Sequence, residues 1–137
     1  MSTIEIHYEG QLRTAATHMA SRAGLLTDAP VDNQGKGESF SPTDLVATGL
    51  GSCMLTIMGI VAERHGLDMS NASAEVTKVM AADPVRRIAR LEVTLRIPGS
   101  FDGKARAALE KAALGCPVHA TLGSTVEMPV NFIWDKD

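Results

Sequence analysis

The sequence predicts an α+β fold, because segments typical of strands and helices follow one another without a regular βαβ alternation. Three observations carry this prediction. Short segments with alternating polar and apolar residues open the chain, a long apolar stretch with a helical start follows, and two more alternating segments come after it. The chain has 137 residues, so we expect a single domain over residues 1–137.

The N-terminal part of the chain is predicted to form strands and turns. Residues 3–8 (TIEIHY) alternate polar and apolar side chains, as a half-buried strand does. Two more strands are expected over residues 12–16 and 23–27, with a turn near Ser21 between them. A polar loop that contains glycine, residues 32–39, then leads into the long helix.

The long helix begins with a complete start signal. Ser41 is a natural N-cap, Pro42 suits the first helical position, and Asp44 at the third position can reach back to the cap. Its length borders on a membrane span, but the cap, the carboxylate and the polar last turn favour a buried core helix over residues 42–65. Apolar side chains cover most of its circumference, so a partner subunit or a second layer must cover it.

The second half of the chain returns to strands. Residues 72–80 and 87–97 both alternate and are predicted to form a hairpin around residues 83–84. An amphipathic helix is expected over residues 101–114, and a last strand over residues 125–134. The predicted architecture is therefore antiparallel sheets around a long central buried helix.

Composition and charge exclude several classes of function. The formal net charge is −3, which leaves no basic surface for nucleic acid or for a membrane. The N-terminus lacks a basic segment followed by an apolar one, so we expect a cytoplasmic protein, in which thiols stay reduced. The two cysteines then indicate chemistry or packing rather than a structural disulfide.

Cys53 and Cys116 are the candidate reactive residues. Either could be a small buried hydrophobic side chain, because free cysteine is among the most buried residue types. Two thiols on two helical segments are also the minimum for a redox couple. His119 follows Cys116 by three residues, but this pair lacks the further ligands that zinc needs, so no metal site is predicted.

Two segments resemble the cysteine motifs of the OsmC/Ohr family. They are residues 41–53 (SPTDLVATGLGSC) and residues 116–122 (CPVHATL), and the resemblance spans nearly the whole chain, including the turn at residues 27–30. It implies an intertwined homodimer, in which strands of both chains build shared sheets around two central helices that carry the first cysteine.

The resemblance also implies an activity, that of a thiol-dependent peroxidase in the oxidative stress response. Cys53 would attack an organic hydroperoxide or hydrogen peroxide and become a sulfenic acid, and Cys116 would condense with it to a Cys53–Cys116 disulfide. This antioxidant chemistry needs no metal or organic cofactor, but an external thiol or dithiol reductant must restore the thiols.

The sequence departs from the family's pattern at one position. Ohr-like members carry a glutamate ten residues before the first cysteine, where it holds an arginine that activates the thiolate, and this chain has Thr43 there. Asp44 or Glu38 could replace the glutamate, although Asp44 competes as a helix cap. The possible arginines are Arg13 and Arg22, each of which could instead be a solvated surface charge.

A second function fits this departure. The chain could be a non-catalytic, redox-responsive or small-ligand-binding dimer that keeps the scaffold and both thiols but lacks the full activating pair.

Overall fold

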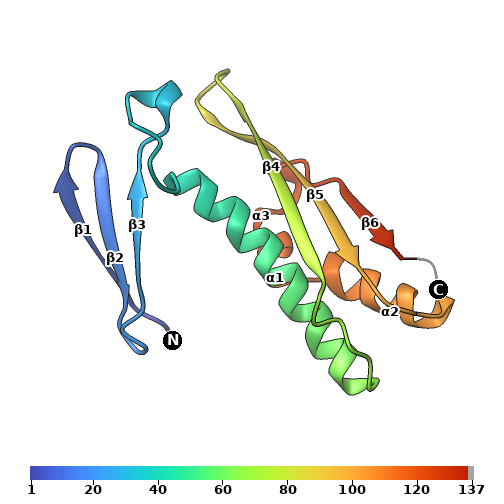
Figure 1. Ribbon diagram of the computed structural model, residues 1–137. Coiled ribbons are helices and arrows are strands. Elements are labelled where there is room, and N and C mark those ends of the chain that lie inside the picture. Colours follow the sequence, from blue (N-terminus) through green and yellow to red (C-terminus); the bar gives the residue numbers. More distant parts are fainter. Residues whose placement is uncertain (136–137) are drawn as a thin grey trace. The chain divides into compact units, whose positions relative to one another are not determined.

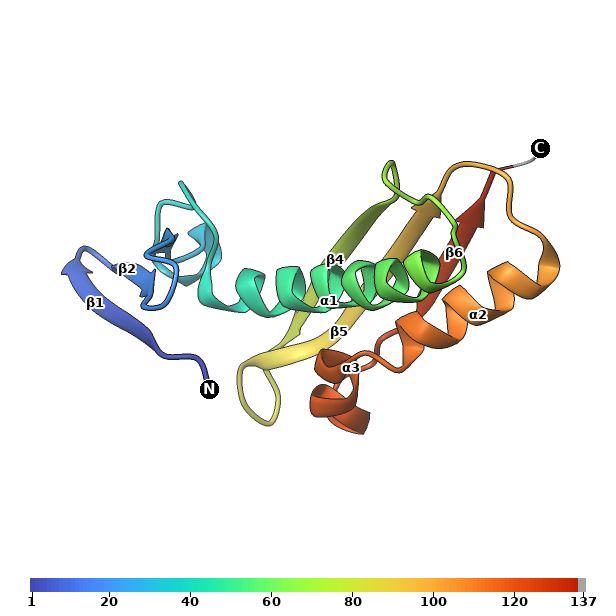
Figure 2. The ribbon, with the colours of Figure 1, turned by 90° about the horizontal axis from the view of Figure 1, so that it is seen from below.

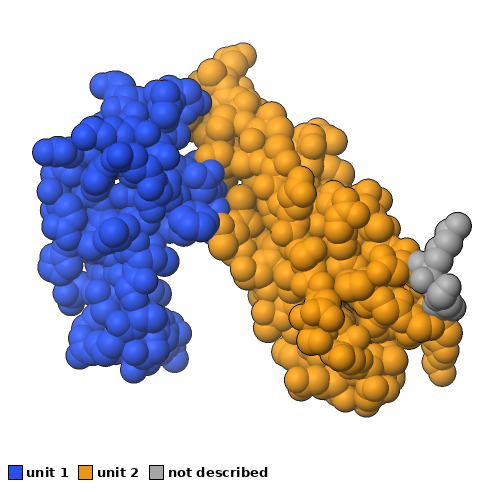
Figure 3. Space-filling view, viewed as in Figure 1, with its two compact units in different colours: residues 1–46 blue, residues 47–137 orange. Residues whose placement is uncertain are grey.

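The computed structural model describes residues 1–135 and is a mixture of helices and strands, as the sequence predicts. The chain divides into two compact units, one of residues 1–46 and one that begins at Ala47 (Figure 3). Each holds one three-stranded sheet.

The first unit is an antiparallel meander of the three strands that the sequence predicts. They are β1 (Ile4–Gly10), β2 (Arg13–His18) and β3 (Gly24–Asp28), in that order across the sheet (Figure 1). Gly10 has a φ of 83°, in the left-handed region that glycine tolerates, which allows the tight turn into β2. After β3 come a short 3-10 turn, Val31–Asn33, and the polar loop.

Helix α1 (Pro42–Arg64) begins where the sequence predicts. The amide of Ser41 donates to Oδ2 of Asp44 at 2.9 Å, and the amide of Asp44 donates to Oγ of Ser41 at 3.1 Å. These reciprocal bonds satisfy donors that have no partner inside the helix, so they fix its first turn.

The second unit holds a mixed sheet of β4 (Ser73–Ala81), β5 (Arg87–Ile97) and β6 (Val130–Trp134). Strands β4 and β5 form the predicted antiparallel hairpin. The prediction of antiparallel sheets needs one correction, because β6 runs parallel to β5. A parallel partner requires a long crossover connection, and the helices between β5 and β6 supply it.

Three helices lie on one side of this sheet: α1, α2 (Gly103–Leu114) and α3 (Pro117–Leu122) (Figure 2). The core between the layers is apolar, and its fully buried side chains include Leu50, Met54, Met58, Leu91, Leu95, Ile97 and Leu109. Gly51 lets α1 approach β4 closely, since a Cβ there would lie 2.9 Å from Cγ2 of Val76.

A single chain buries only part of α1. In its most apolar stretch 33% of the residues are buried, and Ile60 is 43% exposed. By length and composition alone the helix could cross a membrane, a criterion that core helices of soluble proteins also meet. The predicted cover on nearly every side is therefore not supplied by one chain.

The only tryptophan of the chain joins β6 to α2. The ring centre of Trp134 lies 5.5 Å from that of Phe101 and 5.6 Å from the guanidinium carbon of Arg106. The indole Nε1 of Trp134 donates to Oε2 of Glu110 at 2.9 Å. Phe101 precedes α2, and Arg106 and Glu110 belong to it. These contacts therefore hold strand β6 against the start of the crossover connection.

Candidate thiol site

The structure brings the two cysteines together in the second unit. Cys53 lies in the middle of α1 and is half-buried, and Cys116 lies between α2 and α3 and is fully buried. Both are free thiols, and they are within hydrogen-bonding contact of each other. Two thiols in contact can be joined by a disulfide with little rearrangement.

The chain around Cys116 explains its fixed position. Helix α2 ends at Gly115, and Cys116 is in an extended conformation with Pro117 at the first position of α3. Its sulfur takes the acceptor role that serine or aspartate oxygens usually have at this place, since it accepts the amide of His119 at 3.3 Å. The sulfur is thus held by its own backbone while it faces α1.

The surroundings of Cys116 keep its thiol protonated. Burial raises its pKa most, the neighbouring Cys53 raises it further by hydrogen bonding and by its negative charge, and the amides of His119 and Val118 partly oppose this. Only the thiolate is strongly nucleophilic, so the raised pKa disfavours Cys116 as the first nucleophile of the pair.

This raised pKa predicts a loss of stability at alkaline pH. The folded protein holds the Cys116 proton more tightly than the unfolded chain does, so the stabilisation is complete below the unfolded pKa and is lost as the pH rises through the folded pKa. We expect Cys116→Ala to remove part of this alkaline decline. The check is urea unfolding of both proteins from about pH 7 to about pH 10; equal slopes against pH would contradict the expectation.

An arginine and two carboxylates form a second cluster, inside the first unit. Nη2 of Arg13, on β2, pairs with Oε1 of Glu38 and lies 3.6 Å from Oδ2 of Asp28. Asp28 is only 2% exposed and also accepts the amide of Glu38 at 3.0 Å, so it holds the loop and the arginine together. Nε of Arg13 and Oδ1 of Asp28 are buried without a hydrogen-bond partner in the described structure, which leaves the arginine a free donor.

The other predicted residues lie in different settings. Asp44 takes part in the helix cap, and the hydroxyl of Thr43 lies 3.2 Å from that of Ser41. Arg22 sits in a turn after β2, with its guanidinium 4.0 Å from the sulfur of Met19. Glu38, one of the carboxylates proposed to replace the family's glutamate, is paired with Arg13. Sequence reasoning missed Asp28, although it is the last residue of a strand and precedes a turn.

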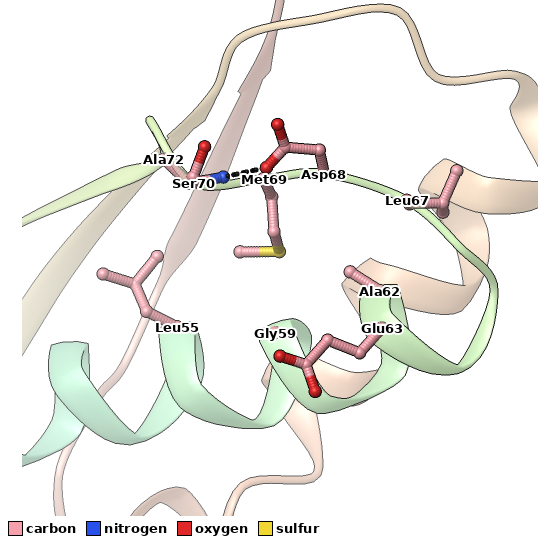
Figure 4. Close-up of a pocket in the computed structure, with 9 residues that line it drawn as sticks. All are labelled: Leu55, Gly59, Ala62, Glu63, Leu67, Asp68, Met69, Ser70 and Ala72. Atoms are coloured by element: carbon pink, nitrogen blue, oxygen red, sulfur yellow. Dashed lines mark hydrogen bonds between the residues drawn. The ribbon is translucent and has the colours of Figure 1, made fainter.

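A separate pocket of about 280 Å³ lies between the C-terminal half of α1 and the segment that leads to β4 (Figure 4). Figure 4 shows the side chain of Met69 reaching toward the helix, while Asp68 accepts the amide of Ser70 at 2.9 Å, a bond that lowers its pKa. The pocket is lined by Leu55, Gly59, Ala62, Glu63, Leu67, Asp68, Met69, Ser70 and Ala72. None of these is a predicted site residue, so this pocket and the thiol pair are distinct features.

Comparison with known proteins settles the family. The family model described as OsmC-like protein matches residues 35–131, which include both cysteines. The chain belongs to the OsmC-like family. No match was found among curated protein sequences.

Solved structures of the family agree with this fold. A protein from Psychrobacter arcticus 273-4, provisionally named an osmotic stress induced and detoxification response protein, is 47% identical, with 96% of each chain covered and a TM-score of 0.91. An OsmC-like protein from Mycoplasma pneumoniae is 16% identical, with 99% of this chain and 98% of that chain covered and a TM-score of 0.84.

An organic hydroperoxide resistance protein OsmC from Legionella pneumophila is 18% identical to this OsmC-like chain. The comparison covers 97% of this chain and 96% of the other, with a TM-score of 0.75. At such identities the last two structures share the fold with this chain, and the fold alone.

Proposed function

We propose that this OsmC-like protein is a thiol-dependent peroxidase that reduces organic hydroperoxides or hydrogen peroxide. The observation that carries the proposal is the contact between two free thiols of unequal burial, one half-buried and one fully buried. The naming of a structural relative for resistance to organic hydroperoxides supports the substrate class.

In the proposed oxidation, bonds form and break only at the two thiols and the peroxide. The thiolate of Cys53 attacks the terminal oxygen of ROOH, the O–O bond breaks, and ROH leaves with a proton while Cys53 becomes a sulfenic acid. Cys116 then attacks this sulfur and releases water, which leaves the Cys53–Cys116 disulfide. A cytoplasmic thiol or dithiol reduces it, so no metal or organic cofactor takes part.

The test is a single oxidation with one equivalent of cumene hydroperoxide. We expect both thiols to disappear within seconds and the chain to lose two hydrogen atoms by intact-mass spectrometry, without a change in the number of linked chains. If most of the thiols remain after this time, the result would instead favour the non-catalytic, redox-responsive or ligand-binding protein. For that function the pocket beside Met69 would be the place to look for a ligand.

We further propose that Arg13, held by Glu38 and Asp28, supplies the positive charge that activates the Cys53 thiolate in the assembled protein. Arg13 has a buried donor without a partner, and a cation beside a thiol lowers the thiol pKa. Glu38 would take the role that the family gives to a glutamate at the position of Thr43.

Arg13→Gln is expected to slow the oxidation of Cys53 by about tenfold or more, because the variant loses the positive charge that favours a thiolate. Arg22→Gln is the matched control, because this arginine contacts Met19 in a turn. The rates come from stopped-flow oxidation at neutral pH. Equal slowing in both variants, or in neither, would remove Arg13 from the site.

The homodimer is also a proposal. Large apolar side chains are exposed on α1 and on the first unit, and they would be covered by a second copy; the main ones are Ile4, Ile6, Tyr8, Leu26, Phe40 and Ile60. Sedimentation equilibrium tests it: a mass of twice the chain supports the dimer, and a stable monomer contradicts it.

A further inference from the structure

The two sulfurs of the thiol pair differ in access, and this difference decides how a disulfide between them would be reduced. Cys116 has no exposed surface in a single chain, whereas Cys53 is partly exposed. Association with another copy can only bury surface, so it cannot uncover Cys116. This asymmetry is observed in a single chain, in which Cys53 lies on the partly exposed helix α1.

We propose that the regenerating thiol attacks the sulfur of Cys53, so that Cys116 is the leaving sulfur and the intermediate is a mixed disulfide on Cys53. The inference rests on the proposed Cys53–Cys116 disulfide. The rate of thiol–disulfide exchange depends on which sulfur the entering thiolate can reach, and here it reaches only one.

The exchange is balanced by two molecules of thiol. The first thiolate forms a bond to Sγ of Cys53, the Cys53–Cys116 bond breaks, and the electron pair leaves with Sγ of Cys116, which takes up a proton. The second thiolate attacks the sulfur of the attached thiol, releases Cys53 and forms a free disulfide. Two thiols are oxidised and the two protein cysteines are reduced.

The surroundings of Cys116 act on the released sulfur in two ways. The amide of His119 already donates to this sulfur at 3.3 Å, and a hydrogen bond to a charged acceptor is stronger than one to a neutral acceptor. Burial raises the pKa of Cys116, which slows its departure as a thiolate but favours its protonation once it is released. When the second thiol arrives, the mixed disulfide is therefore on Cys53 and the proton is on Cys116.

A consequence for the substrate follows. The peroxide and the reductant would act on the same sulfur, so they use the same approach to the protein in turn. A reductant is then selected by what fits beside Cys53 on α1, and not by the surroundings of Cys116.

The experiment uses the full chain with its disulfide formed by diamide, so that the result does not depend on peroxidase activity. A short exposure to limiting glutathione is quenched with acid, free thiols are alkylated after denaturation, and peptides are identified by mass spectrometry. We expect glutathione on Cys53 and the alkyl group on Cys116, with at least about a tenfold preference. The same disulfide opened in guanidinium is the control, because unfolding removes the difference in access.

Glutathione found mainly on Cys116, or spread equally in the folded protein, would overturn the inference. If the disulfide forms poorly, a second measurement tests the same inference. With 5,5′-dithiobis(2-nitrobenzoate), Cys116→Ser, which keeps only Cys53, should react at least about tenfold faster than Cys53→Ser, which keeps only Cys116. If the variant that keeps Cys53 reacts faster but the wild-type protein consumes no peroxide, the peroxidase proposal is rejected. The inference that a thiol attacks Cys53 then still stands.

Discussion

Replacing Cys53 by serine is expected to abolish peroxide consumption, with a loss of at least about a thousandfold in rate. A serine hydroxyl is not ionised at neutral pH and does not reduce a peroxide, so the first step of the proposed reaction has no nucleophile. The side chain is close in size, and Cys53 is only half-buried, so the helix should keep its structure.

The measurement is the disappearance of cumene hydroperoxide in the presence of dithiothreitol, after subtraction of the rate without protein. Circular dichroism and urea unfolding serve as controls for folding. Residual consumption at a tenth of the wild-type rate or more would show that Cys116 can attack the peroxide by itself, in conflict with its burial.

Replacing Cys116 by serine is expected to have the second largest effect, on a different step. The first oxidation should proceed at nearly the wild-type rate, but Cys53 should stop at the sulfenic acid, because no second thiol is in contact with it. Excess peroxide should then convert it to the sulfinic acid, and turnover with a dithiol should fall about tenfold or more.

Serine suits this test because it is a preferred N-cap, so its hydroxyl can accept the amide of His119 in place of the sulfur. Dimedone labelling followed by intact-mass spectrometry detects the sulfenic acid. If the first oxidation slows as much as turnover does, Cys116 would act in the attack itself and not in resolution.

The sequence predicted the start of α1 and the bounds of β5 for different reasons. The start of α1 followed from Ser41 and Asp44, since a cap is a local property of a few residues. Strand β5 has the predicted bounds, because eleven alternating residues leave little choice of register. The direction of β6 beside β5 depends on the whole connection between them, which no local pattern encodes.

Short elements and long-range pairs were harder to predict. Helix α3 was missed because it has six residues and its cap is a cysteine, which is not a usual capping residue. The contact between Cys53 and Cys116 joins α1 to the end of α2, so only packing places it. Glu38 could not be preferred to Asp44 from the sequence, because its pairing with Arg13 depends on how the polar loop returns toward β2.

The lone tryptophan has a practical consequence. Trp134 packs against Phe101 and beneath Arg106, with its indole nitrogen bonded to Glu110, and all four residues lie in the second unit. Excitation near the red edge of protein absorption therefore gives a fluorescence signal from that unit alone. The wavelength of its emission maximum would report the release of β6 from α2 and would not report unfolding of the meander in the first unit.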